Sequence, residues 1–107
     1  MRHASDTGFV TTTVANRGEA RHIAKTLLAE RLAACVQLVE IESHYIWKGE
    51  EKTEPEVMLL IKTRADLFER TIARIRGLHS YETPEIVAQA FSAGFAPYLA
   101  WIAESTG

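Results

Sequence analysis

The chain has 107 residues, of which 47% are hydrophobic, and its 12 Lys and Arg residues and 14 Asp and Glu residues give a formal charge of −2. This length fits one domain, and the charge balance provides no positive field for a phosphate backbone, which excludes nucleic acid as the main partner. The longest apolar runs, such as Val57 to Ile61, are far shorter than the ~20 residues of a bilayer span, and the single cysteine, Cys35, forms no internal disulfide, so we expect a cytoplasmic protein without a membrane partner.

The N-terminal third predicts a tail, a strand and a helix. Residues 1–8 are expected to form a frayed tail. The segment Phe9 to Ala15 is rich in β-branched residues, which favours a strand. Asn16 then caps a helix from about Arg17 to Leu32, and Glu19 stands in the capping-box position.

The middle of the chain predicts an unusually long hairpin. Apolar residues alternate from Cys35 to Trp47 but change parity once, which indicates a bulge or bend near Leu38. Lys48-Gly49 is a plausible turn, and the acidic segment Glu50 to Glu56 leads into Val57 to Ile61, which is apolar on both faces.

The C-terminal third predicts a helix, a strand and a short helix. Thr63 and Asp66 open the second long helix of the chain. Its buried stripe consists of Leu67, Phe68, Thr71, Ile72, Ile75 and Leu78. The segment Glu85 to Phe91 reads as the fourth strand and Pro97 to Glu104 as the last helix, with residues 105–107 as a tail.

The element order is that of an α+β, ferredoxin-like split βαβ fold over residues 9–104, with a four-stranded antiparallel sheet. Right-handed crossovers place both long helices on one sheet face and leave the other face open. In the apolar run Val57 to Ile61, the side chains of Met58 and Leu60 point to the sheet face opposite that of the other three residues. A monomer would therefore expose apolar side chains on one face. Together with a protruding hairpin that carries Tyr45 and Trp47, this pattern predicts self-association.

The charge layout supports the same expectation. Residues 40–56 contain six Glu and two Lys, whereas residues 62–76 contain five Lys or Arg and two acidic residues. Opposite patches on one chain can meet across identical subunits.

Four segments carry a specific set of motifs: Leu28-Ala29-Glu30-Arg31-Leu32-Ala33-Ala34-Cys35-Val36, Ser43-His44-Tyr45-Ile46-Trp47-Lys48-Gly49, Leu60-Ile61-Lys62-Thr63 and His79-Ser80-Tyr81-Glu82-Thr83-Pro84-Glu85. In this order, the Tyr-x-Trp-x-Gly and His-x-Tyr-x-x-Pro-Glu signatures resemble those of the CutA divalent-cation tolerance proteins, and the resemblance extends from Phe9 to Ile102. It implies a ferredoxin-like subunit in a tight homotrimer, similar in architecture to PII signalling proteins. It also implies a role in tolerance of copper and other divalent metals.

Cys35 and His79 are candidate metal ligands. A thiolate suits copper or zinc, but Cys35 equally fits a small apolar residue at the start of a buried strand. His79 stands in a loop with Glu82 and Glu85 nearby, which suits a divalent ion, although a histidine there can instead cap the preceding helix.

The resemblance implies a metal ligand at the position of His79, joined in some members by a neighbouring histidine and a first-strand cysteine. Here those positions hold Leu78 and the threonines 11–13. We therefore expect weak binding of Cu(II) or another divalent metal, with His79 as the main ligand. Glu82 or a carboxylate from a neighbouring chain is the expected weaker partner, and Cys35 contributes only if its strand start is accessible.

A cleft between subunits is the second candidate site. Its expected lining consists of Tyr45, Trp47, Tyr81 and Trp101, with His79, Glu82 and Lys62 as polar groups. Such a cleft suits a small ligand, but Tyr and Trp also dominate protein interfaces, so the aromatic residues can instead pack the trimer contact.

The sequence leaves three hypotheses for the function of the protein. The first is a metal-responsive, non-enzymatic trimer. The second is a PII-like signalling or scaffold trimer that binds a partner protein or a small anion, with Lys62 and Arg64 as the contacts. The third is a hydrolase using Cys35, which we disfavour because no cation or helix N-terminus is expected beside the thiol and no Gly-rich phosphate loop is present.

Overall fold

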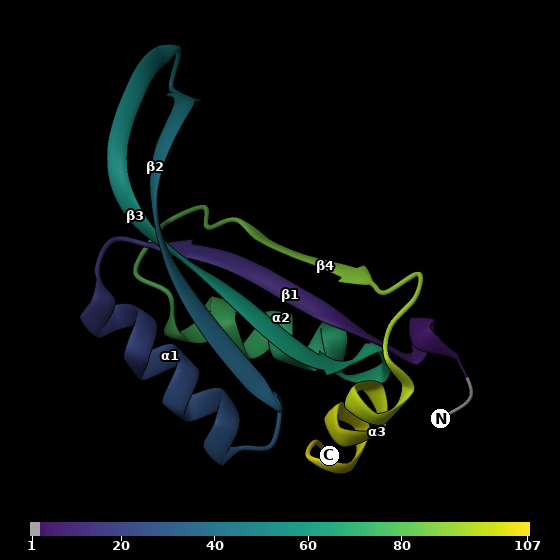
Figure 1. The fold of residues 1–107 in the computed structure, drawn as a ribbon. Helices are drawn as coiled ribbons and strands as arrows, with labels where there is room; N and C mark the ends of the chain where they lie inside the picture. The colour runs from purple at the N-terminus through teal and green to yellow at the C-terminus, as the bar shows by residue number, and fades with distance from the viewer. Residues whose placement is uncertain (1–2) are drawn as a thin grey trace.

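Four strands form one antiparallel sheet in the order β2-β3-β1-β4 in the computed structural model, which describes residues 3–107 (Figure 1). The strands are β1 (Thr7–Val14), β2 (Cys35–Trp47), β3 (Glu50–Arg64) and β4 (Ile86–Ala90). The helices are α1 (Arg17–Ala29), α2 (Phe68–Leu78) and α3 (Ala96–Glu104), with 3-10 helices η1 (Ala4–Asp6) and η2 (Ala65–Leu67). This order confirms the ferredoxin-like α+β fold. Within residues 3–107, no helix is both long and apolar enough to cross a membrane.

The core lies between one face of the sheet and the helices α1 and α2 (Figure 1). Val10 of β1 lies directly opposite Ile61 of β3, so both side chains point to the same face. They pack in one cluster with Ile23 of α1 and Ile75 of α2, and all four are fully buried. Burial of each such side chain stabilises the fold by roughly 1.5–3 kcal/mol.

The opposite sheet face is apolar and incompletely covered in one subunit. Met58 and Leu60 of β3 are half-buried there. Val39 of β2, which pairs with Met58, is 44% exposed, and Val87 of β4 is 56% exposed. The open face expected from the parity of these residues is therefore present.

The β2–β3 hairpin extends far beyond the sheet (Figure 1). β1 pairs with β3 only as far as Val57, whereas β2 and β3 remain paired from Cys35–Lys62 to Trp47–Glu50. Seven cross-strand pairs, from Ile41–Glu56 to Trp47–Glu50, therefore form a projecting two-stranded segment that we call the ribbon. Lys48 (φ 51°) and Gly49 (φ 80°) close it, which confirms the expected turn.

The prediction of a bulge near Leu38 is wrong, because the β2–β3 register continues without interruption. The apolar residues change parity for another reason. Val36 and Leu38 pack against the core, whereas Ile41 and Tyr45 lie on the opposite face, in the part of β2 that has left the sheet.

The described parts of the two expected tails, residues 3–8 and 105–107, are ordered. Residues 1–2 lie outside the described residues, but η1 precedes β1, which begins at Thr7. At the other end, Thr106 is 4% exposed and the Gly107 N–H donates to the Arg31 carbonyl at 2.9 Å. Arg31 itself has a φ of 58°, so α1 ends earlier than the expected Leu32.

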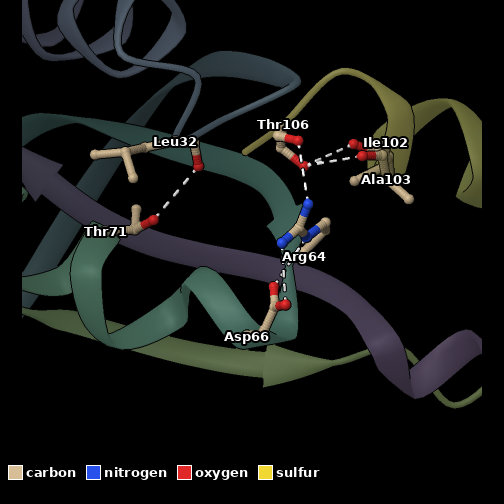
Figure 2. Close-up of polar contacts among 7 residues, drawn as sticks. All are labelled: Leu32, Arg64, Asp66, Thr71, Ile102, Ala103 and Thr106. Carbon is tan, nitrogen blue, oxygen red and sulfur yellow. Dashed lines mark hydrogen bonds and ion pairs between the residues drawn. The ribbon is translucent and has the colours of Figure 1, made fainter. Parts of the chain in front are cut away.

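Arg64 joins the C-terminal segment to the start of η2 (Figure 2). One of its terminal nitrogens donates to the Thr106 carbonyl at 3.2 Å, while its Nε and other terminal nitrogen donate to the two oxygens of Asp66 at 2.9 and 3.0 Å. The hydroxyl of Thr71 in α2 similarly donates to the Leu32 carbonyl at 3.4 Å (Figure 2). These contacts hold the end of the sheet that lies away from the ribbon.

Candidate functional site

A cleft of about 570 Å³ lies where the ribbon, the end of β1 and the loop before β4 meet. Its lining consists of Thr13, Ala15, Ser43, His44, Tyr45, Trp47, Glu54, Glu56, Tyr81, Glu82, Thr83 and Glu85. Four of these residues are glutamates and none is Lys or Arg. The cleft of one subunit therefore suits a neutral or cationic ligand better than a small anion.

Two tyrosine–glutamate pairs stand in this cleft. The Tyr81 hydroxyl donates to Glu56 Oε2 at 2.7 Å, and the Tyr45 hydroxyl donates to Glu54. Burial, followed by the hydrogen bond to Glu56, raises the pKa of Tyr81 well above its usual range. The hydrogen bond to Glu54 likewise raises the pKa of Tyr45. Both phenols therefore stay protonated, and able to donate, to a higher pH than an ordinary tyrosine.

His79 lies behind the cleft, only 8% exposed, and uses both ring nitrogens. Nε2 lies 2.8 Å from the Thr13 carbonyl, which can only accept, so Nε2 carries the proton. Nδ1 accepts from the Tyr81 backbone N–H at 3.1 Å and lies 3.7 Å from a Glu19 oxygen. The ring therefore ties the loop after α2 to β1. It does not cap α2 with its side chain, because only its backbone N–H bonds to Ile75, at 2.9 Å.

The expected metal ligands do not converge in one subunit. Cys35 pairs with Lys62, whereas His79 binds Thr13, which pairs with Met58 four residues away along β3. At the rise of a strand, this separation is about 13 Å. Glu82 lies in the cleft lining, exposed and apart from Cys35. Within residues 3–107, no group of three or more His, Cys, Asp and Glu side chains could hold a metal ion.

The expected cleft residues separate into two groups. Tyr45, Trp47 and Tyr81 line the cleft with Glu82. Lys62 lies outside this lining and donates to Gln37 Oε1 at 2.5 Å. Trp101 stacks on Tyr98 in α3, with ring centroids 5.7 Å apart, at the end of the sheet away from the ribbon (Figure 1). A cleft between subunits that includes Lys62 and Trp101 stays a prediction.

Three glutamates of this region were missed by sequence reasoning. Glu54 and Glu56 accept from the cleft tyrosines, and their alternate spacing on one face of β3 was an available signal. Glu19 accepts from both the backbone N–H and the hydroxyl of Ser80 at 2.9 Å. Glu19 and Ser80 are far apart in sequence, so local spacing gave no indication of this contact.

Comparison with known proteins agrees with this fold. The family model of the CutA1 divalent ion tolerance protein matches residues 8–105. The divalent-cation tolerance protein CutA of Thermus thermophilus is 45% identical over 96 residues, which cover 89% of this chain and 93% of that protein. The human protein CutA is 38% identical over 88% of this chain. The matched part covers 53% of the human protein, which is longer.

The same agreement holds for solved structures. CutA from Xylella fastidiosa has a TM-score of 0.92 at 38% identity, over 96% of this chain and 100% of that chain. The Archaeoglobus fulgidus protein, described as a periplasmic divalent cation tolerance protein, has a TM-score of 0.90 at 35% identity, over 92% and 97% of the two chains. This chain belongs to the CutA1 divalent ion tolerance family.

Proposed function

We propose that this chain acts in tolerance of divalent cations as a non-enzymatic homotrimer. The observation that carries the proposal is the family match over residues 8–105, because relatives that are covered almost completely by this chain are named for this role. The acidic cleft is compatible with a cation rather than with the small anion considered as the alternative.

The trimer is supported by three features of the isolated subunit. The open sheet face exposes Val39 and Val87, and the ribbon exposes Ile46 (66%) and Trp47 (37%). β2 is also an edge strand over 13 residues, whose outer backbone groups can pair with another chain. Two further copies of the same chain can cover all three surfaces by closed symmetry.

Weak binding of Cu(II) or another divalent metal belongs to this proposal. Ligation through Nε2 of His79 would break its hydrogen bond to Thr13, so the described geometry weighs against this ring as the main ligand. Cu(II) titrated into wild type and His79→Ala tests the expectation directly. Equal binding by the two proteins would remove His79 from the ligand set.

Growth in graded Cu(II) and Zn(II) tests the function. A host lacking its own family member should regain tolerance when this chain is expressed, and a vector without the chain serves as the control. Unchanged sensitivity at normal protein levels would contradict the proposal. Fractionation of the same cells tests the cytoplasmic location, which we propose from the single cysteine.

A further inference from the structure

The loop after α2 is anchored twice to the body of the subunit. His79 Nε2 donates to the Thr13 carbonyl at 2.8 Å, next to the last residue of β1. The backbone N–H and the hydroxyl of Ser80 donate to the two carboxylate oxygens of Glu19 in α1, each at 2.9 Å. These contacts fix the loop relative to both β1 and α1, so the residue that follows Ser80 starts from a fixed position.

Tyr81 reaches from this fixed loop to the root of the ribbon. Its backbone N–H donates to His79 Nδ1 at 3.1 Å, and its hydroxyl donates to Glu56 Oε2 at 2.7 Å. β1 pairs with β3 only as far as Val57, so Glu56 is the ribbon residue of β3 nearest to the sheet. The hydroxyl bond therefore joins the body of the subunit to the ribbon at the point where the ribbon leaves the sheet (Figure 1).

No comparable contact holds the ribbon elsewhere. Within residues 3–107, the bond between Tyr81 and Glu56 is the only side-chain hydrogen bond or ion pair that joins residues 41–56 to the rest of the subunit. Just below the root, Arg17 Nε of α1 lies 3.3 Å from Glu40 Oε1, but these side chains are 47% and 70% exposed, and such exposed ion pairs contribute little. Tyr81 and Glu56 are both half-buried, and their bond has a charged acceptor, so it is the stronger of the two contacts.

We propose that residues 79–81 form a tether that aims the ribbon, with Tyr81 as a positioning residue whose bond to Glu56 sets the angle at which the ribbon leaves the sheet. The ribbon projects by seven cross-strand pairs, or roughly 20 Å at the rise of a strand, so a rotation of about 15° at its root moves its tip by roughly 5 Å. Tyr81 and Glu56 also line the cleft, so the same bond couples the shape of the cleft to the direction of the ribbon. The biological meaning of the tether rests on the proposed homotrimer, in which the ribbon contacts other subunits.

Distances between spin labels test the proposal on the whole chain. Labels are attached at two exposed positions, Glu51→Cys on the ribbon and His22→Cys on α1, in a Cys35→Ser background. Labelled chains are mixed with an excess of unlabelled chains, so that only pairs within one subunit are measured. The parent protein should give one narrow distance distribution. Tyr81→Phe keeps the ring but removes the hydroxyl, so it should broaden the distribution or shift its maximum by several ångströms.

The chain offers a matched control for this change. Tyr45→Phe removes the corresponding bond to Glu54, which lies entirely within the ribbon, and should leave the distribution narrow. Glu56→Gln keeps an oxygen that accepts from the Tyr81 hydroxyl and should behave like the parent, whereas Glu56→Leu should behave like Tyr81→Phe. The proposal is overturned if Tyr81→Phe and the parent give the same distribution, or if Tyr45→Phe broadens it as much as Tyr81→Phe does.

Light scattering of the unlabelled variants separates this inference from the proposed assembly. Tyr81→Phe should dissociate at about tenfold higher protein concentration than wild type, because a ribbon that is no longer aimed must be ordered when the subunits meet. A monomeric wild type whose distance distribution is narrow and is broadened by Tyr81→Phe would reject the homotrimer and keep the tether. A trimeric wild type whose distribution is unaffected by Tyr81→Phe would reject the tether and keep the homotrimer.

Discussion

At the scale of single residues, His79 is a structural tie between β1 and the loop after α2. Replacing it with alanine leaves the Thr13 carbonyl and the Tyr81 N–H without their buried partner. We expect His79→Ala to lower the free energy of unfolding by about 1–3 kcal/mol, measured by denaturant titration at one fixed protein concentration. His22→Ala, on the exposed face of α1, is the control and should change stability by less than about 0.5 kcal/mol. Equal stability of the two variants would contradict the structural role.

Tyr81 should make stability depend on alkaline pH. Its pKa is raised in the folded state, so its protonated form is favoured by folding. The stabilisation is therefore complete below the ordinary tyrosine pKa of about 10 and is lost as the pH rises above that value. Thermal melts from pH 8 to 11 should show a steeper decline for wild type than for Tyr81→Phe. Parallel declines would show that ionisation of Tyr81 is not coupled to folding.

The cleft could be predicted only in part from single residues. Tyr45, Trp47 and Tyr81 belong to recognisable motifs, and they do line one cleft. The partner of His79 could not be predicted, because it is a backbone carbonyl on β1 and any residue type supplies one. For the same reason, the sequence left His79 open between metal ligand and helix cap. Its side chain does not cap α2, and metal ligation by His79 stays a prediction.

At the scale of elements, Arg31 connects the end of α1 to the end of α3. Its Nε donates to the Gly107 carbonyl at 3.0 Å and a terminal nitrogen donates to the Glu104 carbonyl at 3.2 Å. Its backbone φ of 58° is unfavourable for a residue with a Cβ, by roughly 1–2 kcal/mol. Arg31 thus combines local strain with contacts between distant elements.

Two substitutions separate these effects. Arg31→Ala loses the side-chain contacts and keeps the strain, whereas Arg31→Gly loses the contacts and relieves it. We expect Arg31→Ala to be less stable than Arg31→Gly by about 1 kcal/mol in denaturant titrations. If alanine is the more stable replacement, the left-handed conformation does not persist in solution.

The elements themselves were largely predictable, since their periodicity is local. The bounds of β2, the start of α1 and the end of α3 agree with the prediction, whereas the end of α1 and the order of the chain ends do not. The C-terminal segment is ordered by the contacts of Arg31 and Arg64 with carbonyls of Gly107 and Thr106, which join positions far apart in sequence. The uninterrupted β2–β3 register could not be predicted either. A strand that bulges and a strand that leaves the sheet give the same change of parity in the sequence.

At the scale of the whole molecule, the ribbon and the open sheet face require a common explanation. Within residues 3–107, no third strand pairs with the ribbon, and isolated two-stranded hairpins are only marginally stable in water. The open face exposes valines that a stable monomer would bury. Both features are accounted for if each subunit's ribbon and sheet face contact other copies of the chain.

Trp47 gives a point test of this assembly. Truncation of a large buried aromatic side chain costs about 3–5 kcal/mol, and Trp47 is 37% exposed in one subunit, so the assembly should bury what remains. We expect Trp47→Ala to weaken the trimer, measured as a lower melting temperature and as dissociation on dilution in light scattering. A variant that keeps both the oligomeric state and the melting temperature would show that Trp47 is not an interface anchor.

Shortening the ribbon tests the assembly as a whole. Deleting residues 43–46 and 51–54 removes four cross-strand pairs but keeps the turn, the register and the face of every remaining side chain. The deletion leaves the core cluster intact, because its buried strand residues lie outside the ribbon: Val10, Val14, Val57, Leu59 and Ile61. Wild type should scatter light as a trimer with a melting temperature that rises with protein concentration, whereas the shortened chain should be a folded monomer that melts independently of concentration. A shortened chain that remains trimeric would place the subunit contacts on the sheet face alone, and a monomeric wild type would refute the assembly.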